Sequence, residues 1–204
     1  MIRHAHTLSL AALAALAAGC AATMDDMSAS STYERPETTD LLANGLDGFD
    51  IRGGANWSYA DGVAEADSGE MGFLFTKEAY GDFELSLEFY VGGPVDNSGV
   101  YFRCDNMDAL ADTTCYEANI YDDRPDQSGR TGGIPNYLPP TVSLDSAGKW
   151  NFYTIRAEGD HIKITLNGVV TVDGHDATHA GASPIGFQWG AGTVKFRNMK
   201  IERL

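Results

Sequence analysis

Short segments in which apolar residues occupy every second position recur along the chain, and this period limits the fold more than any other feature. Phe83–Phe89 reads FELSLEF, and His161–Leu166 and Val194–Arg197 follow the same alternation. Such alternation is typical of β-strands that bury one face. Turn-forming residues separate the segments, among them Asn167-Gly168, a pair that favours a type I′ hairpin turn. No amphipathic helical stretch of any length is visible beyond Leu41. The sequence therefore predicts an all-β domain of two packed antiparallel sheets.

The charge balance excludes several classes of partner. Among 204 residues, 14 are Lys or Arg and 29 are Asp or Glu, which gives a formal net charge of −15. A strongly acidic chain repels phosphate backbones and anionic lipid headgroups, so we expect no nucleic-acid partner and no charge-driven adsorption to a membrane. The 43% of hydrophobic residues is enough for one folded domain and too high for a disordered polyelectrolyte.

The first twenty residues have the pattern of an export signal. Arg3 precedes an apolar run over Leu8–Ala18, which is too short to cross a bilayer as a mature helix. Ala17–Cys20 (AAGC) resembles a bacterial lipobox, in which the cysteine is lipidated and becomes the mature N-terminus. An ordinary signal peptide with a chance cysteine is the alternative. We predict a signal peptide over residues 1–19, lipidation of Cys20, a flexible tether over residues 20–38 and a folded domain over residues 39–204. The protein is then expected to be exported and lipid-anchored to the bacterial envelope, so that its membrane partner is reached through the lipid.

The two remaining cysteines, Cys104 and Cys115, are expected to form a disulfide. Disulfides persist in exported proteins, and a bridge that closes a loop of this length contributes about 3 kcal/mol to stability. The further Cys or His residues that a structural zinc site requires are not found near these two in the sequence.

The strands beside these cysteines are expected to present one polar surface. Apolar residues alternate with polar or aromatic ones in Val100–Arg103 and in Tyr116–Tyr121, so the apolar sides of both strands can meet the core. The residues left on the opposite side are Tyr101, Arg103, Glu117, Asn119 and Tyr121. A disulfide between directly paired strand positions would put Phe102 and Glu117 on the same side, which contradicts this arrangement. We therefore place the disulfide beyond the strand ends.

This surface has the composition of a sugar-binding site. It combines a cation, a carboxylate and an amide, which bind hydroxyl groups, with tyrosine rings, which cover apolar sugar faces. An ordinary solvated sheet face that carries an Arg–Glu pair is the alternative.

At these strands the sequence resembles a known family. Asn97–Arg103 (NSGVYFR) is similar to the Asn-Ser-Gly-x-x-x-Arg signature of the 3-keto-disaccharide hydrolase domain family. Further segments follow the family's order, namely Leu42–Gly45, Thr76–Phe89, Tyr116–Asp122, Gly148–Asn151, Leu166–Gly168, Pro184–Gln188 and Phe196–Asn198. The match runs from about Leu41 to Leu204. It implies a concanavalin A-like jelly-roll sandwich, in agreement with the strand pattern.

The resemblance also implies cleavage of the glycosidic bond of sugars oxidised to the 3-ketone, by elimination and hydration. Such a site needs a general base and a group that stabilises the enolate oxygen. Glu117 is the candidate base, Arg103 the candidate oxyanion partner and Gln188 a substrate-positioning group. The other candidate substrate-binding residues are Tyr101, Asn119, Tyr121 and Trp189. No cofactor is required, but a divalent cation is compatible with the chemistry, with Asp122 and Glu117 as candidate ligands.

One position departs from the family's pattern. Members often carry Gln-x-His-Gly before the last strand, where this chain has Gln188–Ala191 (QWGA), so Gly190 stands at the place of the histidine. His175 and His179 are the candidate substitutes. Trp189 is equally suited to stacking on a sugar without turnover. A non-catalytic glycan-binding or envelope-interaction domain therefore remains the alternative function.

The sequence contains two further acidic groups that resemble known kinds of site. Glu84, Ser86 and Glu88 share one side of a strand, in the outline of the paired carboxylates of laminarinase-type glycosidases. An acidic segment, Asp122 to Asp126, has the oxygen ligands that calcium prefers, but a solvated turn before Pro125 is the favoured explanation. Phosphate-binding loops and Gly-x-Ser-x-Gly elbows are not found in the sequence.

Overall fold

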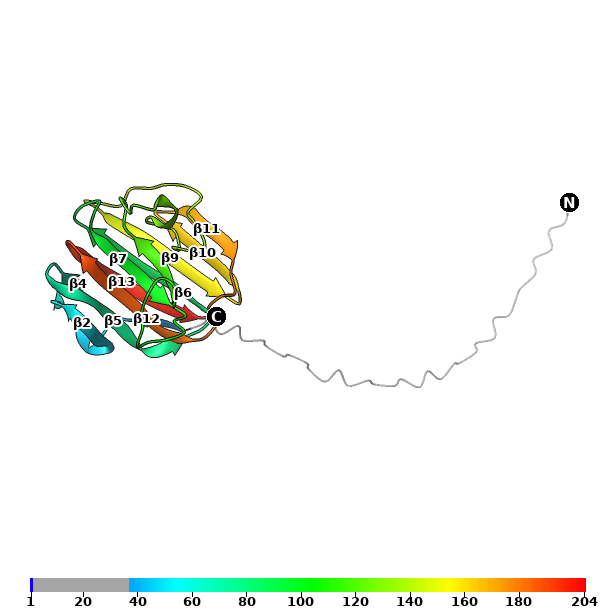
Figure 1. Ribbon diagram of the computed structural model, residues 1–204. Coiled ribbons are helices and arrows are strands. Elements are labelled where there is room, and N and C mark those ends of the chain that lie inside the picture. The colour runs from blue at the N-terminus through cyan, green and yellow to red at the C-terminus, as the bar shows by residue number, and fades with distance from the viewer. Residues whose placement is uncertain (2–36) are drawn as a thin grey trace. The chain divides into compact units, whose positions relative to one another are not determined.

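The computed structural model describes residue 1 and residues 37–204, and thirteen β-strands in the second of these ranges form two antiparallel sheets. The larger sheet contains β1 (Thr38–Asp40), β3 (Ser58–Ala60), β4 (Val63–Ala66), β6 (Phe83–Val91), β9 (Trp150–Glu158), β10 (His161–Leu166), β11 (Val169–His175) and β13 (Val194–Arg203). Its order is β11-β10-β9-β6-β13-β4-β3, and β1 pairs with β13. Figure 1 shows β10, β9, β6 and β13 side by side.

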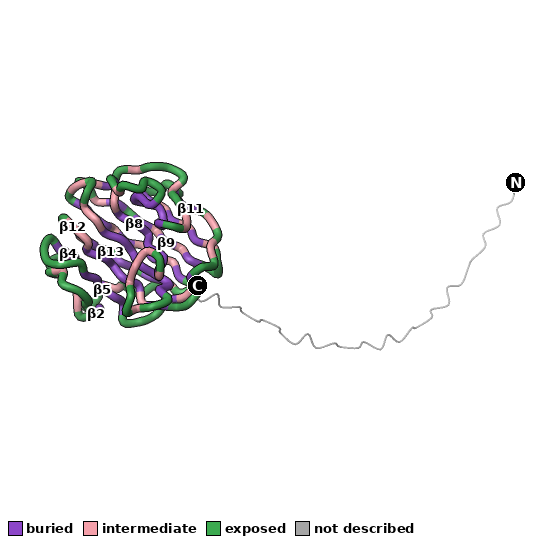
Figure 2. Tube along the Cα trace, in the orientation of Figure 1, coloured by how far each residue is buried: buried purple, intermediate pink, exposed green. Residues whose placement is uncertain are grey.

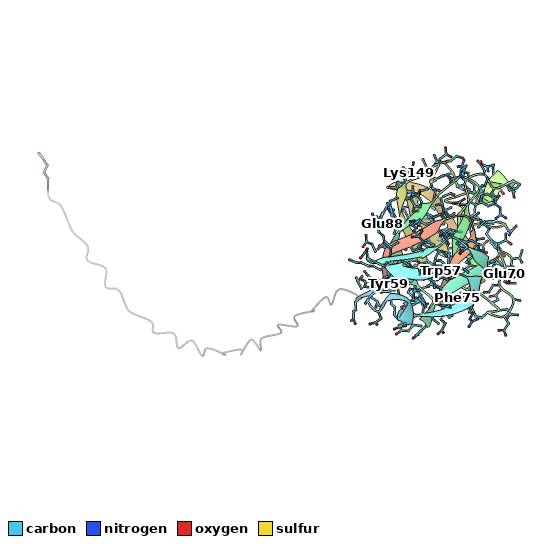
Figure 3. The ribbon with its side chains drawn as sticks, turned by 90° about the vertical axis from the view of Figure 1, so that its left-hand side faces the viewer. Trp57, Tyr59, Glu70, Phe75, Glu88 and Lys149 are labelled. Carbon is cyan, nitrogen blue, oxygen red and sulfur yellow. A yellow bond between two sulfur atoms is a disulfide. The ribbon has the colours of Figure 1, made fainter. Side chains whose placement is uncertain are left out.

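The smaller sheet contains β2 (Phe49–Ala55), β5 (Gly69–Tyr80), β7 (Asn97–Phe102), β8 (Tyr116–Ile120) and β12 (Ser183–Ala191). Its order is β2-β5-β12-β7-β8. Two short 3₁₀ helices, η1 (Gly45–Gly48) and η2 (Gln127–Gly129), lie in the connections. The chain thus has the predicted all-β fold, a jelly-roll sandwich. In the side view of Figure 3, Glu88 of β6 and Glu70 of β5 lie toward opposite sides of the sandwich.

The alternating segments bury their apolar side, as predicted. Leu85, Leu87 and Phe89 of β6 are fully buried, and they join the same core cluster as Val100 and Phe102 of β7. Burial of one such side chain contributes roughly 1.5–3 kcal/mol. Figure 2 shows the buried residues along the middle of the strands and the exposed ones in the loops.

The hairpin prediction at Asn167-Gly168 is also confirmed. The two residues connect β10 to β11, and their φ angles are 53° and 82°. Both lie in the left-handed region that a type I′ turn requires. The Asn167 side chain also accepts a hydrogen bond from the backbone N–H of Phe152, at 2.9 Å.

The register of β7 and β8 matches the predicted faces. Tyr101 lies opposite Glu117, and Phe102 lies opposite Tyr116. Cys104 and Cys115 form the predicted disulfide, with their Cα atoms 4.1 Å apart. The bridge lies just beyond the ends of both strands, as alternation of the side chains requires.

The predicted signal peptide, Cys20 and most of the tether lie outside the described residues, so these remain predictions. Within residues 37–204, every helix is too short or too polar to cross a membrane.

Candidate functional site

A pocket of about 490 Å³ lies on the outer face of the smaller sheet. Strands β5, β7, β8 and β12 form its floor. One wall is the loop closed by the disulfide, residues 105–114, which we call the disulfide loop. The opposite wall is the segment after β8. The lining residues are Met71, Phe73, Asn97, Tyr101, Leu110, Ala111, Asp112, Glu117, Tyr121, Arg124, Pro125, Asp126 and Gln188.

Glu117 is the buried carboxyl group of this pocket. It projects from β8 and is only 4% exposed. Its carboxylate lies over Gly99 of β7, where a Cβ atom would come within 2.3 Å of Glu117 Oε1. Burial, and then the negative charge of Asp112, raises the pKa of Glu117 to about 8; a hydrogen bond with Tyr101 and the charge of Arg124 act in the opposite direction. A carboxyl group with this pKa exchanges its proton near neutral pH, as an acid–base catalyst must.

Two neighbours of Glu117 supply polar atoms to the pocket. Gln188 Nε2 donates a hydrogen bond to Tyr101 Oη at 3.3 Å. Gln188 Oε1 is buried and has no hydrogen-bond partner within the described part of the protein. A buried acceptor without a partner is costly, so this atom is available to a ligand hydroxyl. Burial, with a smaller contribution from the charge of Glu117, raises the pKa of Tyr101 above its ordinary value, so this phenol keeps its proton.

The cation of the pocket is Arg124, a residue that no sequence pattern marked as a candidate. Arg124 Nη2 forms an ion pair with Asp112 Oδ2 at 3.1 Å, and the two side chains are 25% and 27% exposed. The pair connects the segment after β8 with the disulfide loop. Both residues lie in irregular segments, where alternation gives no information on which way a side chain points.

The prediction that Arg103 shares a surface with Glu117 is wrong. The residue follows the last residue of β7 and has a φ of 50°, so the alternation of the strand ends before it. Its side chain is 1% exposed and donates to the backbone oxygens of Gly81 and Gly159 and to the carboxylate of Asp82. Arg103 therefore links the β5–β6 and β9–β10 turns and is not an oxyanion partner for this pocket.

Two other candidates make their contacts outside the pocket. Asn119 lies on the predicted side of β8 but is covered, because its amide donates to the Gly129 oxygen and accepts from the Ile120 N–H. Trp189 points into the core, where its Nε1 donates to the Gly192 oxygen at 2.9 Å. Neither lines the pocket, whereas Tyr121 does.

Asp122 is a structural residue rather than a metal ligand. Its carboxylate is 3% exposed and accepts hydrogen bonds from Thr131 Oγ1, from the N–H and hydroxyl of Ser146 and from the Ala147 N–H. Four donors occupy its lone pairs. Among residues 37–204, no group of three or more His, Cys, Asp or Glu is placed to hold a metal ion. The donor set thus does not fit a protein-held divalent cation, and we assign no step to one.

The space beside Gly190 is filled by an amide. A Cβ atom at Gly190 would lie 2.6 Å from Nδ2 of Asn97, which lines the pocket. Neither candidate histidine substitutes there. His179 is buried between Asp105 and Tyr137, at 2.6 and 2.8 Å, and His175 pairs with Asp160 at the surface.

The paired glutamates of β6 do not belong to the pocket either. They lie on the other sheet, where Glu84 pairs with Arg156 and Glu88 pairs with Arg197. In the acidic segment after β8, Asp126 caps η2 by accepting a hydrogen bond from the Ser128 N–H at 3.0 Å. Each of these carboxylates is therefore engaged in a contact within the protein and has a structural role.

Comparison with known structures supports the fold. Two proteins from Parabacteroides distasonis, each provisionally named a glycosyl hydrolase, superpose with TM-scores of 0.67; their identities are 25% and 19%, over 82% of this chain and 100% and 94% of theirs. The carbohydrate-binding module CBM66 from Bacillus subtilis superposes with a TM-score of 0.60 at 19% identity, over 76% of this chain and 95% of that module. Likeness below 25% identity shows the fold alone. A comparison with curated proteins found no match.

The family itself is shown by a sequence model that spans nearly the whole described domain. The model of the 3-keto-alpha-glucoside-1,2-lyase-like domain matches residues 38–202. Those residues include all of β1 to β12 and every residue that lines the pocket. The chain therefore belongs to the 3-keto-alpha-glucoside-1,2-lyase-like domain family.

Proposed function

We propose that the protein cleaves the glycosidic bond of 3-keto-glycosides by elimination followed by hydration. The observation that carries this proposal is Glu117, a buried carboxyl with a raised pKa on the floor of an open pocket. Its neighbours Tyr101 and Gln188 offer hydrogen bonds without charge. The membership of the family adds weight to this chemistry.

The chemistry requires one group that takes a proton and gives it back. A C3 ketone acidifies the hydrogen on C2, and the Glu117 carboxylate removes that proton while the C3 oxygen becomes an enolate. The electron pair then restores the ketone and forms a C1=C2 double bond as the bond from C1 to the aglycone oxygen breaks. The proton on Glu117 passes to the departing oxygen, so the carboxylate is regenerated. Water then adds a hydroxyl to C1 and a proton to C2.

Tyr101 and Gln188 are suited to bind rather than to transfer protons. The Tyr101 hydroxyl donates to the Glu117 carboxylate until Glu117 takes up the C2 proton, and it can then donate to the enolate oxygen. Because the pKa of Tyr101 is raised, it does so without losing its proton. Gln188 Oε1, the buried acceptor without a partner in the described domain, is suited to a sugar hydroxyl. These roles replace the one predicted for Arg103.

The lining of the pocket is compatible with a sugar ring. Its apolar members are Met71, Phe73, Leu110, Ala111 and Pro125, and the remaining side chains are polar. A volume of about 490 Å³ lies within the usual range of small-molecule sites. We infer a ligand with one apolar face and several hydroxyl groups.

Release of a chromogenic aglycone from a 3-keto-glucoside tests the proposal, with the unoxidised glucoside as the matched control substrate. We expect turnover of the ketone alone, a slower reaction when C2 carries deuterium, and unchanged rates with a chelator. The kcat/KM should rise with pH and level off above about pH 8, because the base must be deprotonated. Binding of the ketone without turnover would instead support a glycan-binding domain.

We also propose that the protein is exported and anchored through a lipid on Cys20. The disulfide Cys104–Cys115 is typical of an oxidising compartment and supports export. Mass spectrometry of the mature N-terminus should find a lipidated Cys20, and Cys20→Ala should move the protein from the membrane to the soluble fraction. An unmodified N-terminus at another residue would contradict the anchor.

A further inference from the structure

The disulfide loop is held firmly over the pocket. Cys104 and Cys115 close its base, and Leu110 and Met107 pack on the cluster that contains Phe73. Near its end, the backbone oxygen of Asp112 accepts a hydrogen bond from Asn136 Nδ2 at 3.0 Å, and the backbone oxygen of Thr113 accepts one from the Tyr137 hydroxyl at 3.3 Å. The Asp112 carboxylate is thereby kept at the wall of the pocket.

Arg124 is fixed on the opposite wall. Its backbone oxygen accepts a hydrogen bond from Gln127 Nε2 at 2.6 Å, and its guanidinium reaches Asp112 at 3.1 Å. Ion pairs that are this exposed usually contribute at most about 1 kcal/mol to stability. The ion pair therefore contributes little to stability, and its main effect is to place two opposite charges in the lining of the pocket.

The charges around Glu117 come from few groups. The polar groups that line the pocket with it are Asn97 and Tyr101 on β7, Asp112 on the disulfide loop, Tyr121, Arg124 and Asp126 after β8, and Gln188 on β12. Tyr101 stays neutral, so the ionised neighbours are two carboxylates and one guanidinium. Asp112 raises the pKa of Glu117 and Arg124 lowers it.

We propose that Asp112 and Arg124 are positioning residues of this pocket, which together set the charge that Glu117 experiences and hence the pH at which the pocket works. Asp112 disfavours the ionised form of Glu117 and Arg124 favours it. Their ion pair keeps both side chains at the pocket wall. This inference rests on the proposed function for its catalytic consequence, whereas the effect on the protonation of Glu117 is independent of turnover.

The test is a direct titration of the Glu117 side-chain carboxyl by carbon-13 NMR in the full chain, with the signal assigned by its loss in Glu117→Gln. Asp112→Asn should lower the midpoint and Arg124→Gln should raise it, each by about half to one pH unit. Arg124→Lys keeps the charge and should leave the midpoint close to that of the original protein. Asp108→Asn removes a charge from the same loop outside the pocket lining and should have no effect.

The sign of the change in the Glu117 titration midpoint supports or contradicts the inference. Shifts of the same sign in Asp112→Asn and Arg124→Gln, or no shift in either, would overturn it, provided that circular dichroism shows both variants folded. If one variant does not fold, the other still decides by the sign of its shift. Where turnover occurs, the pH at half-maximal kcat/KM should move with the NMR midpoint. Opposite NMR shifts without any turnover would support this inference and contradict the proposed function.

Discussion

At the scale of single residues, Glu117 combines a functional position with a cost to stability. Its pKa is about 8 in the folded protein, against an ordinary value of 4.5, so the folded state holds the proton more tightly than the unfolded state. The contribution of Glu117 to stability is therefore greatest below about pH 4.5 and is lost as the pH rises toward 8. The loss is about 1.4 kcal/mol per pH unit in this window, or about 3 kcal/mol at pH 7.

Glu117→Gln should therefore be inactive and more stable. A glutamine does not ionise, so the free energy of unfolding of the variant should exceed that of the original protein by up to about 3 kcal/mol at pH 7 and by less than about 1 kcal/mol at pH 5. Urea unfolding at both pH values measures the difference. A difference that does not grow with pH would contradict the raised pKa.

Gly99 leaves the room that the carboxylate occupies. A Cβ atom there would lie 2.3 Å from Glu117 Oε1, so Gly99→Ala must push the end of that side chain aside. The added Cβ atom would also lie 2.7 Å from Cγ and 2.9 Å from Cδ of this buried side chain, so the whole side chain must shift. We expect a lower free energy of unfolding and at least about a tenfold loss in kcat, since a misplaced base is much less effective. Gly181→Ala, at an exposed bend outside the pocket where an added Cβ atom meets nothing within 4 Å, is a matched control for the added methyl group. Equal activity of Gly99→Ala and the original protein would show that the position of Glu117 is not critical.

The side-chain directions of some single residues could be predicted from the sequence and those of others could not. Alternation placed Glu117 and Tyr101 correctly because both lie inside regular strands. It failed at Arg103, where the backbone turns left-handed just after β7. For Trp189 the signal was present: it stands two positions after buried Phe187, so the same alternation that turns Gln188 toward the pocket turns Trp189 into the core. The metal ligand proposed at Asp122 is instead bonded to residues from 9 to 25 positions away, which no local pattern reveals.

At the scale of elements, strands were predictable and loops were not. The segments found by their period became β6, β10 and part of β13, because one buried face imposes a period of two on the sequence. The disulfide loop and the segment after β8 have no such constraint. Their contribution to the pocket, Asp112 and Arg124, depends on tertiary contacts across the pocket.

The disulfide should matter for both stability and binding. Cys104→Ala/Cys115→Ala removes the bridge that closes the disulfide loop, and we expect a loss of about 2–4 kcal/mol in the free energy of unfolding. Because Leu110 and Asp112 then lose their anchor, KM should rise more than kcat falls. Urea unfolding and steady-state kinetics test this, with the original protein in its disulfide-bonded form as the reference. An unchanged KM would show that the wall keeps its position without the bridge.

At the scale of the whole molecule, the outer faces of the two sheets differ: one carries the pocket and the other does not. The smaller sheet supplies the floor of the pocket, while several charged outer residues of the larger sheet pair with one another, as Glu84 does with Arg156 and Glu88 with Arg197. Arg103 links two turns at the margin of the sandwich through three hydrogen-bonded partners. The family signature thus contains both a pocket residue, Tyr101, and a residue that holds the sandwich together.

The pocket and both sheets lie in residues 38–203, so a chain that begins at Arg35 should be fully functional. We expect its Tm and its kcat/KM to equal those of the longer chain, because every lining residue and every strand is retained. A chain that begins at Gly45 lacks β1, which pairs with β13, and the buried side chain of Leu42. Loss of that one side chain from the core costs roughly 2 kcal/mol, so this shorter chain should have a lower Tm. Differential scanning calorimetry and aglycone release compare the three chains. A drop in kcat/KM for the chain from Arg35 would mean that residues before it take part in the reaction, and catalysis would then not be confined to the sandwich.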